Sequence, residues 1–123
     1  MTTGIIVFAH GSRVEPANQA VRDVASALLR PRGPYEHVVT AFLELGRPDM
    51  AGAAAQLAAA GVKRVVVIPY FLTLGLHLER DLPKLLQETA RQFPDVEFVV
   101  TPPLDGHEAL RQILLDRARE ATG

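Results

Sequence analysis

Four runs of apolar, largely β-branched residues alternate along the chain with segments whose apolar residues recur at helical spacing. The strand-like runs span residues 4–9, 37–43, 64–70 and 96–101, and the helical segments span residues 16–28, 50–58, 82–93 and 107–118. Continuous apolar strands joined by helices are typical of a parallel sheet buried on both faces. The most economical doubly wound arrangement of four such strands has the order 2-1-3-4, with helices on both faces. The pattern therefore predicts an α/β fold of this kind.

Each helical segment is predicted to bury one apolar face against the sheet. The predicted faces consist of Ala17, Val21, Val24 and Leu28; of Met50, Ala53, Ala54, Leu57 and Ala58; of Leu82, Leu85, Leu86, Ala90 and Phe93; and of Leu110, Ile113, Leu114 and Ala118. Residues 71–80 are interpreted as a long turn, because Asp81 and Pro83 suit the first positions of the helix that follows.

Composition limits the domain count and the classes of partner. The 123 residues are 48% hydrophobic, which predicts one domain over residues 1–123 with a core of its own. Thirteen basic and fourteen acidic residues give a net charge of −1, so neither nucleic acid nor an anionic membrane is an expected partner. The longest apolar run, residues 65–76, is too short to span a bilayer. With no basic leader at the N-terminus, we expect a cytoplasmic protein.

The chain contains no cysteine. Disulfides, iron–sulfur clusters and thiolate zinc sites are therefore excluded. His, Asp and Glu remain as the strong metal ligands, so any metal chemistry must use nitrogen and oxygen donors.

Three residues with chemically useful side chains follow three of the predicted strands. Ligands of doubly wound sheets bind beyond the carboxyl ends of the strands at the switch point, here between the first and third strands. His10 follows the first strand, Glu44 follows the second, and His77 lies beyond the third. Together they would form a sparse site for a divalent transition metal. The same groups would equally suit proton transfer near neutral pH.

Other residues near this edge suit an anionic or flat ligand. A backbone nest at Ser12 and the guanidinium of Arg13 would bind a carboxylate, although both residues would also serve a simple turn and a surface ion pair. The apolar residues 70–76 offer a wall for a large flat ligand, a surface for another subunit, or a loop packed on the sheet. His37 and His107 are expected to be structural. Glu44 could equally be a solvated surface carboxylate without a role in the site.

Four segments in this order resemble the small sirohydrochlorin chelatases, the short form of the class II chelatase superfamily. These segments are residues 10–13 (His-Gly-Ser-Arg), 41–44 (Ala-Phe-Leu-Glu), 65–69 (Val-Val-Val-Ile-Pro) and 75–83 (Gly-Leu-His-Leu-Glu-Arg-Asp-Leu-Pro). Leu82 stands where the family more often has isoleucine. The resemblance implies a half-sized domain that forms a homodimer around one tetrapyrrole cleft. It also implies that His10 and His77 handle the metal, with Glu44 as an acidic partner.

The implied activity is insertion of a divalent metal into sirohydrochlorin without an organic cofactor. Co²⁺, for cobalamin synthesis, is the expected substrate metal, with Fe²⁺ for sirohaem or Ni²⁺ for a related cofactor as alternatives. The carboxylates of sirohydrochlorin would need cationic or N–H partners. We expect these from Ser12, from helix N-termini after the first and third strands, and from the cationic residues Arg13, Arg47, Arg80 and Lys84.

Two other functions compete with this interpretation. A serine hydrolase using Ser12 with a histidine and Asp81 is disfavoured, because the chain has no Gly-x-Ser-x-Gly elbow. A flavodoxin-like metal carrier without turnover remains open. Its nucleotide-binding version is weakened by the absence of Gly-x-Gly-x-x-Gly and Walker motifs.

Overall fold

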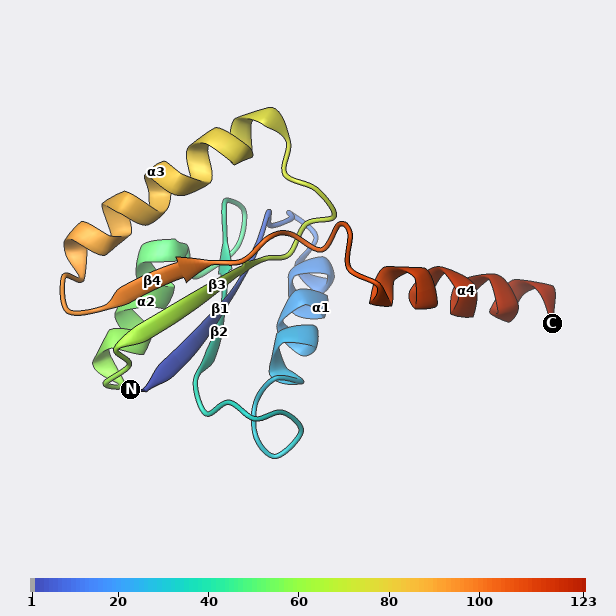
Figure 1. Ribbon diagram of the computed structural model, residues 1–123, viewed down its shortest axis with the longest axis horizontal. Coiled ribbons are helices and arrows are strands. Elements are labelled where there is room, and N and C mark those ends of the chain that lie inside the picture. Colours follow the sequence, from blue (N-terminus) through green and yellow to red (C-terminus); the bar gives the residue numbers. More distant parts are fainter. Residues whose placement is uncertain (1) are drawn as a thin grey trace.

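Four parallel strands form one sheet in the order β2-β1-β3-β4, which confirms the predicted topology (Figure 1). The computed structural model describes residues 2–123. The strands are β1 (Thr3–Ala9), β2 (Val38–Phe42), β3 (Arg64–Pro69) and β4 (Glu97–Val100), and the helices are α1 (Glu15–Ser26), α2 (Met50–Ala59), α3 (Leu76–Gln92) and α4 (Ala109–Thr122). Each strand boundary lies within one residue of its prediction. No helix in residues 2–123 has the length and apolar character needed to cross a bilayer.

Strand β1 is the centre of the sheet and of the core. Its last six residues are all buried, and it pairs in parallel with β2 on one side and β3 on the other. Side chains of alternate residues point to opposite faces, so Ile5 and Val7 face one layer while Ile6 and Phe8 face the other. Both faces of β1 are thus covered, as its continuous apolar run predicts.

Helix α1 packs on β2 and β1 on one face of the sheet. Val21 and Leu28 pack against the core as predicted, but the buried side of the helix is rotated away from Ala17 and Val24. Ala25 is buried and Val21 packs beside it, whereas Val24 is 51% exposed. Ala17 is exposed as well, and Asn18 is buried in its place. Positions 18, 21 and 25 are themselves at helical spacing. Because Asn18 is polar, the apolar pattern did not indicate that this side of the helix faces the sheet.

Helices α2 and α3 cover the opposite face. Met50, Ala53 and Leu57 of α2 are buried in the main core, as predicted. The side chain of Asp49 caps α2 by accepting a hydrogen bond of 2.8 Å from the Gly52 N–H. Ala54 is buried beside the other core residues of α2, so the alanine-rich face of this helix packs on the sheet.

The third helix begins earlier than predicted. α3 starts at Leu76, so residues 76–80 are helical rather than part of a turn, and Pro83 lies inside the helix. The reason is that helical apolar spacing continues upstream of Pro83. Leu78 packs against the core beside the buried Leu82, one turn before it.

The predicted burial of the last helix is wrong for this chain by itself. No residue of α4 is buried, and Ile113 and Leu114 are 50% and 71% exposed. The helix extends away from the sheet (Figure 1). Only three of the four helices therefore cover the sheet of their own chain.

Candidate active site

The carboxyl ends of β1 and β2 bring two of the predicted site residues together. The parallel pairing continues beyond the strands, because the N–H groups of Leu43 and Glu44 donate to the carbonyl oxygens of Ala9 and His10 at 2.9 and 3.0 Å. His10 Nε2 consequently lies 3.4 Å from Glu44 Oε1, and each side chain is 57% exposed. The structure thus places an imidazole and a carboxylate side by side at an open edge.

The position of the His10 ring leaves one of its nitrogens available. His10 Nδ1 lies 3.1 Å from the carbonyl oxygen of Gly11, which can only accept a hydrogen bond. In the tautomer that satisfies this contact, Nδ1 carries the proton and Nε2 has a free lone pair. Nε2 can then ligate a metal or take up a proton, and Glu44 would stabilise the imidazolium that proton uptake forms.

Gly11 is required by the close approach of the two loops. Its φ of +94° lies in the region that favours glycine, and a Cβ atom added there would lie 1.7 Å from the carbonyl oxygen of Glu44. A side chain at this position would push the loop that carries His10 away from the loop that carries Glu44. The glycine of the His-Gly-Ser segment is therefore a structural condition for the pair.

Asn18 of α1 connects the same two loops through hydrogen bonds, and the sequence analysis did not identify it. Its side chain is 1% exposed. Oδ1 accepts from the Ser12 N–H at 2.8 Å, and Nδ2 donates to the carbonyl oxygens of Ser12 and Leu45 at 2.9 and 3.1 Å. Nδ2 also donates to Glu15 at 3.2 Å. The helical row of Asn18 with Val21 was the signal that could have identified it.

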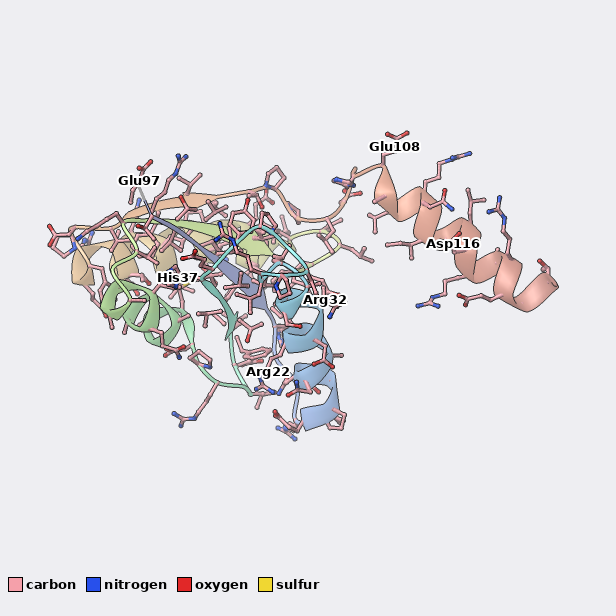
Figure 2. The ribbon with its side chains drawn as sticks, turned by 90° about the horizontal axis from the view of Figure 1, so that it is seen from below. Arg22, Arg32, His37, Glu97, Glu108 and Asp116 are labelled. Atoms are coloured by element: carbon pink, nitrogen blue, oxygen red, sulfur yellow. The ribbon has the colours of Figure 1, made fainter. Side chains whose placement is uncertain are left out.

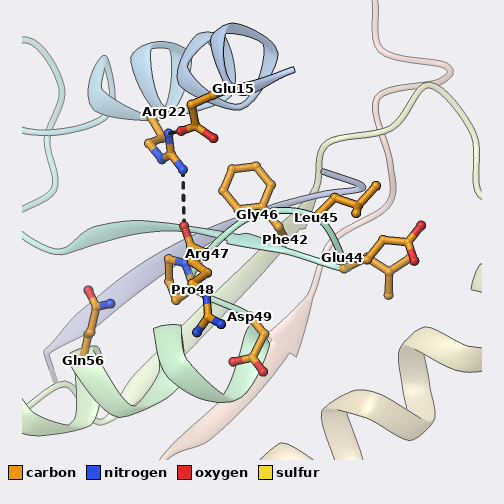
Figure 3. Close-up of a pocket in the computed structure, with 11 residues that line it drawn as sticks. Glu15, Arg22, Phe42, Glu44, Leu45, Gly46, Arg47, Pro48, Asp49 and Gln56 are labelled. Carbon is orange, nitrogen blue, oxygen red and sulfur yellow. Dashed lines mark hydrogen bonds and ion pairs between the residues drawn. The ribbon is translucent and has the colours of Figure 1, made fainter. Parts of the chain in front are cut away.

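A hollow of about 960 Å³ lies beside Glu44, between α1 and the loop that connects β2 to α2 (Figure 3). Arg22 forms an ion pair with Glu15, stacks 5.3 Å above the ring centroid of Phe42, and donates to the carbonyl oxygen of Arg47 at 3.4 Å. Hydrogen bonds from Arg22 and Asn18 hold the pKa of Glu15 below its ordinary value. These contacts fix the wall of the hollow next to the histidine–carboxylate pair.

His77 lies on the first turn of α3, not in the predicted loop. Its Nδ1 is 3.2 Å from Nη2 of Arg80, one turn further along, and Arg80 Nε also approaches Asp81 at 3.9 Å. His77 is exposed. Because Arg80 can only donate, Nδ1 acts as the acceptor and Nε2 carries the proton in the neutral ring.

The structure does not join His77 to His10 and Glu44. Among residues 2–123 no group of three His, Asp or Glu side chains lies close enough to hold a metal ion. The predicted three-residue metal site is therefore not assembled within one chain. Its components are a two-residue pair at β1 and β2 and a separate histidine on α3.

The other predicted site residues have different surroundings. Ser12 Oγ accepts from the Val14 N–H at 3.0 Å, so its hydroxyl serves the turn. Arg13 and Arg47 are exposed, and their guanidinium groups make no hydrogen bond or ion pair within the described residues 2–123. Both are free to meet an anionic ligand. His107 accepts from the Ala109 N–H at 3.0 Å, in keeping with its expected structural role.

Comparison of the sequence with known proteins identifies the family of this chain. A family model described as CbiX matches residues 4–121. This chain belongs to the CbiX family. The sirohydrochlorin cobaltochelatase of Methanopyrus kandleri is 30% identical to it over 97% of the chain and 96% of the relative. The chloroplastic sirohydrochlorin ferrochelatase of Arabidopsis thaliana is 34% identical over 93% of the chain.

Solved structures share the CbiX fold. A CbiX protein from Marinobacter aquaeolei VT8 has a TM-score of 0.85 at 24% identity, over 97% of this chain and 96% of that one. SirB of Bacillus subtilis subspecies spizizenii, a sirohydrochlorin chelatase in complex with cobalt, has a TM-score of 0.87 at 22% identity over 98% of this chain. The chain spans about half the length of SirB and of the Arabidopsis relative. It thus corresponds to one half of the longer chelatases.

Proposed function

We propose that this chain is a sirohydrochlorin chelatase that inserts a divalent metal into the free-base tetrapyrrole. The observation that carries the proposal is the pair formed by His10 and Glu44, 3.4 Å apart at the open switch-point edge of a CbiX-family fold. A pair that is 57% exposed can be reached by a broad, flat macrocycle, whereas a buried pair could not.

The chemistry requires a base more than a tight metal cage. Insertion replaces two ring N–H protons by one M²⁺ ion, so two protons must leave as the ion binds the four ring nitrogens. The Nε2 lone pair of His10 accepts one of these protons, and Glu44 stabilises the resulting imidazolium. His77 supplies a second imidazole from α3. Weak, incomplete ligation suits transfer, because an ion held by a closed set of four ligands would not leave.

The residues that would bind the carboxylates of sirohydrochlorin are proposed from their positive charge or their N–H groups. The unpaired guanidinium groups of Arg13 and Arg47 would meet carboxylates of sirohydrochlorin. Arg80 and the backbone N–H of Ser12 would contribute on either side. The N-terminus of α3, which no side chain caps, would add N–H donors. The N-terminus of α1 contributes less, because Pro16 has no N–H and the Ala17 N–H donates to the Val14 carbonyl oxygen at 2.9 Å.

Co²⁺ is proposed as the substrate metal, in cobalamin synthesis in the cytoplasm. The support is that several archaeal relatives of similar length are named cobaltochelatases. Imidazole and carboxylate ligands discriminate weakly among Co²⁺, Fe²⁺ and Ni²⁺, so the relative named for iron defines the main competitor. Two copies of the chain are proposed to enclose one tetrapyrrole, because each copy by itself presents only an open wall.

An anaerobic insertion assay tests the proposal. Purified protein is mixed with sirohydrochlorin and, in parallel, with Co²⁺, Fe²⁺ or Ni²⁺ at matched free concentrations, and metallation is followed by absorbance. The wild type should exceed the spontaneous rate, fastest with Co²⁺. Stoichiometric metal binding without acceleration would identify a carrier instead, and fastest insertion of Fe²⁺ would identify a ferrochelatase.

The site assignment is tested with matched histidine variants. His10→Ala and His77→Ala should abolish insertion while the circular dichroism spectrum and tetrapyrrole binding are retained. His37→Ala, a histidine outside the site, is the control and should keep the wild-type rate. Normal insertion by His10→Ala would overturn its role as the base.

A further inference from the structure

The loop between β2 and α2 contains a leucine in a backbone conformation that favours glycine. Leu45 has a φ of +57°, and among residues 2–123 it is the only residue other than glycine with a positive φ. In this left-handed region the Cβ atom crowds the following carbonyl oxygen, so glycine or asparagine is the usual occupant. Leucine at this position therefore lowers the stability of the fold relative to a residue that accepts the conformation freely.

The neighbours of Leu45 impose this conformation. The carbonyl group of Glu44, which precedes it, lies so close to Gly11 that a Cβ atom there would come within 1.7 Å of the carbonyl oxygen. The carbonyl oxygen of Leu45 itself accepts a hydrogen bond from Asn18 Nδ2 at 3.1 Å. Contacts thus fix the peptide groups on both sides of Leu45, and such surroundings are what allow a strained residue to persist.

The rest of the loop is anchored on the buried Phe42 and on α1. A Cβ atom added at Gly46 would lie 2.8 Å from Phe42 Cγ, so this glycine packs directly on the ring. The Phe42 N–H donates to the carbonyl oxygen of Pro48 at 2.9 Å. Arg22 reaches from α1 to the carbonyl oxygen of Arg47 at 3.4 Å (Figure 2). None of these contacts uses the leucine side chain, so the loop closes without it.

The side chain of Leu45 is directed to the same side as the carboxylate of Glu44. It is 50% exposed and belongs to neither apolar cluster of the core. Figure 3 shows both side chains extending from the loop in one direction, away from Arg22. In an extended segment two consecutive side chains would point to opposite sides. The strained backbone therefore places an exposed apolar group beside the acidic member of the candidate active site.

Other exposed apolar side chains lie at the same edge of the sheet. Leu43 and Leu45, on either side of the carboxylate, are 41% and 50% exposed. Leu72 and Leu76, which are 65% and 84% exposed, lie between the end of β3 and His77. Exposed apolar surface around a few polar groups is typical of a binding site. It suits a ligand with a flat apolar face.

We propose that Leu45 is held in its strained conformation so that its side chain contacts the face of the tetrapyrrole macrocycle beside Glu44. This inference rests on the proposed function and adds a specificity-determining residue to it. A free-base tetrapyrrole is flat and apolar over its faces, and its carboxylates lie at the rim. A leucine under the face fixes the height of the ring above His10 and Glu44, and the rim carboxylates remain free to meet the arginines.

Binding of metal-free sirohydrochlorin, followed by absorbance, tests the contact without an insertion step. Leu45→Gly removes both the side chain and the strain, whereas Leu45→Ala removes the side chain and keeps the strain. Leu45→Met keeps an apolar side chain of similar volume. Val24→Ala is the matched control, because Val24 is 51% exposed but lies in the last turn of α1. Native mass and the urea midpoint are measured for each variant at one protein concentration.

Two results together support the inference. Leu45→Gly and Leu45→Ala should each weaken tetrapyrrole binding by about fivefold through the loss of one apolar contact. Leu45→Met and Val24→Ala should bind as the wild type does. Leu45→Gly should also unfold at a higher urea concentration than Leu45→Ala, because glycine accepts a positive φ. In the insertion assay the change should appear in KM, with kcat within about twofold of wild type.

The opposite results overturn it. Wild-type binding by Leu45→Gly would refute the contact and leave the proposed function intact. A urea midpoint for Leu45→Gly no higher than that for Leu45→Ala would show that the position is not strained. A smaller native mass for either variant would assign the side chain to an interface between copies instead. If the wild type itself does not bind sirohydrochlorin, the proposed function fails and this inference fails with it.

Discussion

Replacing Asn18 with alanine should destabilise the fold and displace the candidate active site together. The buried amide makes hydrogen bonds to three backbone groups, namely the N–H and C=O of Ser12 and the C=O of Leu45. A hydrogen bond of this kind contributes about 1 kcal/mol net. The free energy of unfolding should therefore fall by about 3 kcal/mol, because alanine leaves all three groups without their partner.

Urea unfolding followed by circular dichroism measures this change, at one protein concentration because assembly would otherwise alter the midpoint. Gln19→Ala is the matched control, since Gln19 is the next residue of the same helix and its side-chain hydrogen bonds, to Asp23 and from Arg22, are both exposed. The control should stay within about 0.5 kcal/mol of wild type. A loss below about 1 kcal/mol in Asn18→Ala, or full insertion activity in that variant, would refute the argument that Asn18 positions the two loops.

Three further predictions concern single residues. Gly11→Ala should reduce metal insertion strongly, because its Cβ would lie 1.7 Å from the Glu44 carbonyl oxygen; an unchanged rate would contradict this. Glu15→Gln should remove a pH-dependent part of stability: the folded-state pKa of Glu15 is lowered from 4.5, so its contribution is present at neutral pH and lost as pH falls below about 4.5. Unfolding at pH 7 and pH 3 measures it, and equal differences from wild type at both would argue against it. Asp49→Ala removes the cap on Gly52 and should cost about 1 kcal/mol, measured by urea unfolding; Asp49→Asn should retain most of it.

The sheet could be predicted because its signals are local and redundant. Six consecutive apolar residues in β1 specify a strand with both faces covered, and the alternating helices then restrict the strand order to a few possibilities. The start of α3 was not predicted because Asp81 and Pro83 resemble helix-start residues. The apolar contact of Leu78 with the core is a tertiary effect that such local signals do not contain.

Only the part of the candidate site that directly follows the strands could be predicted from the sequence. His10 and Glu44 follow adjacent strands, so parallel pairing alone brings their backbones together. The role of Asn18 depends on the rotation of α1, which a polar residue in the inward row disguises. The helical spacing of Leu110, Ile113 and Leu114 predicts an apolar face on α4, but this spacing carries no information about whether the sheet of the same chain covers that face.

The strand order also determines when the core can form during synthesis. β1 pairs with β2 on one edge and β3 on the other, and β1 precedes both in the chain. Its second edge stays unpaired until residues 64–69 have left the ribosome, and such non-local parallel pairing is slow. The most apolar strand thus keeps one unpaired edge while residues 10–69 are synthesised, at about 5–20 residues per second. Aggregation of the nascent chain, rather than instability of the finished fold, is then the expected weakness of this topology.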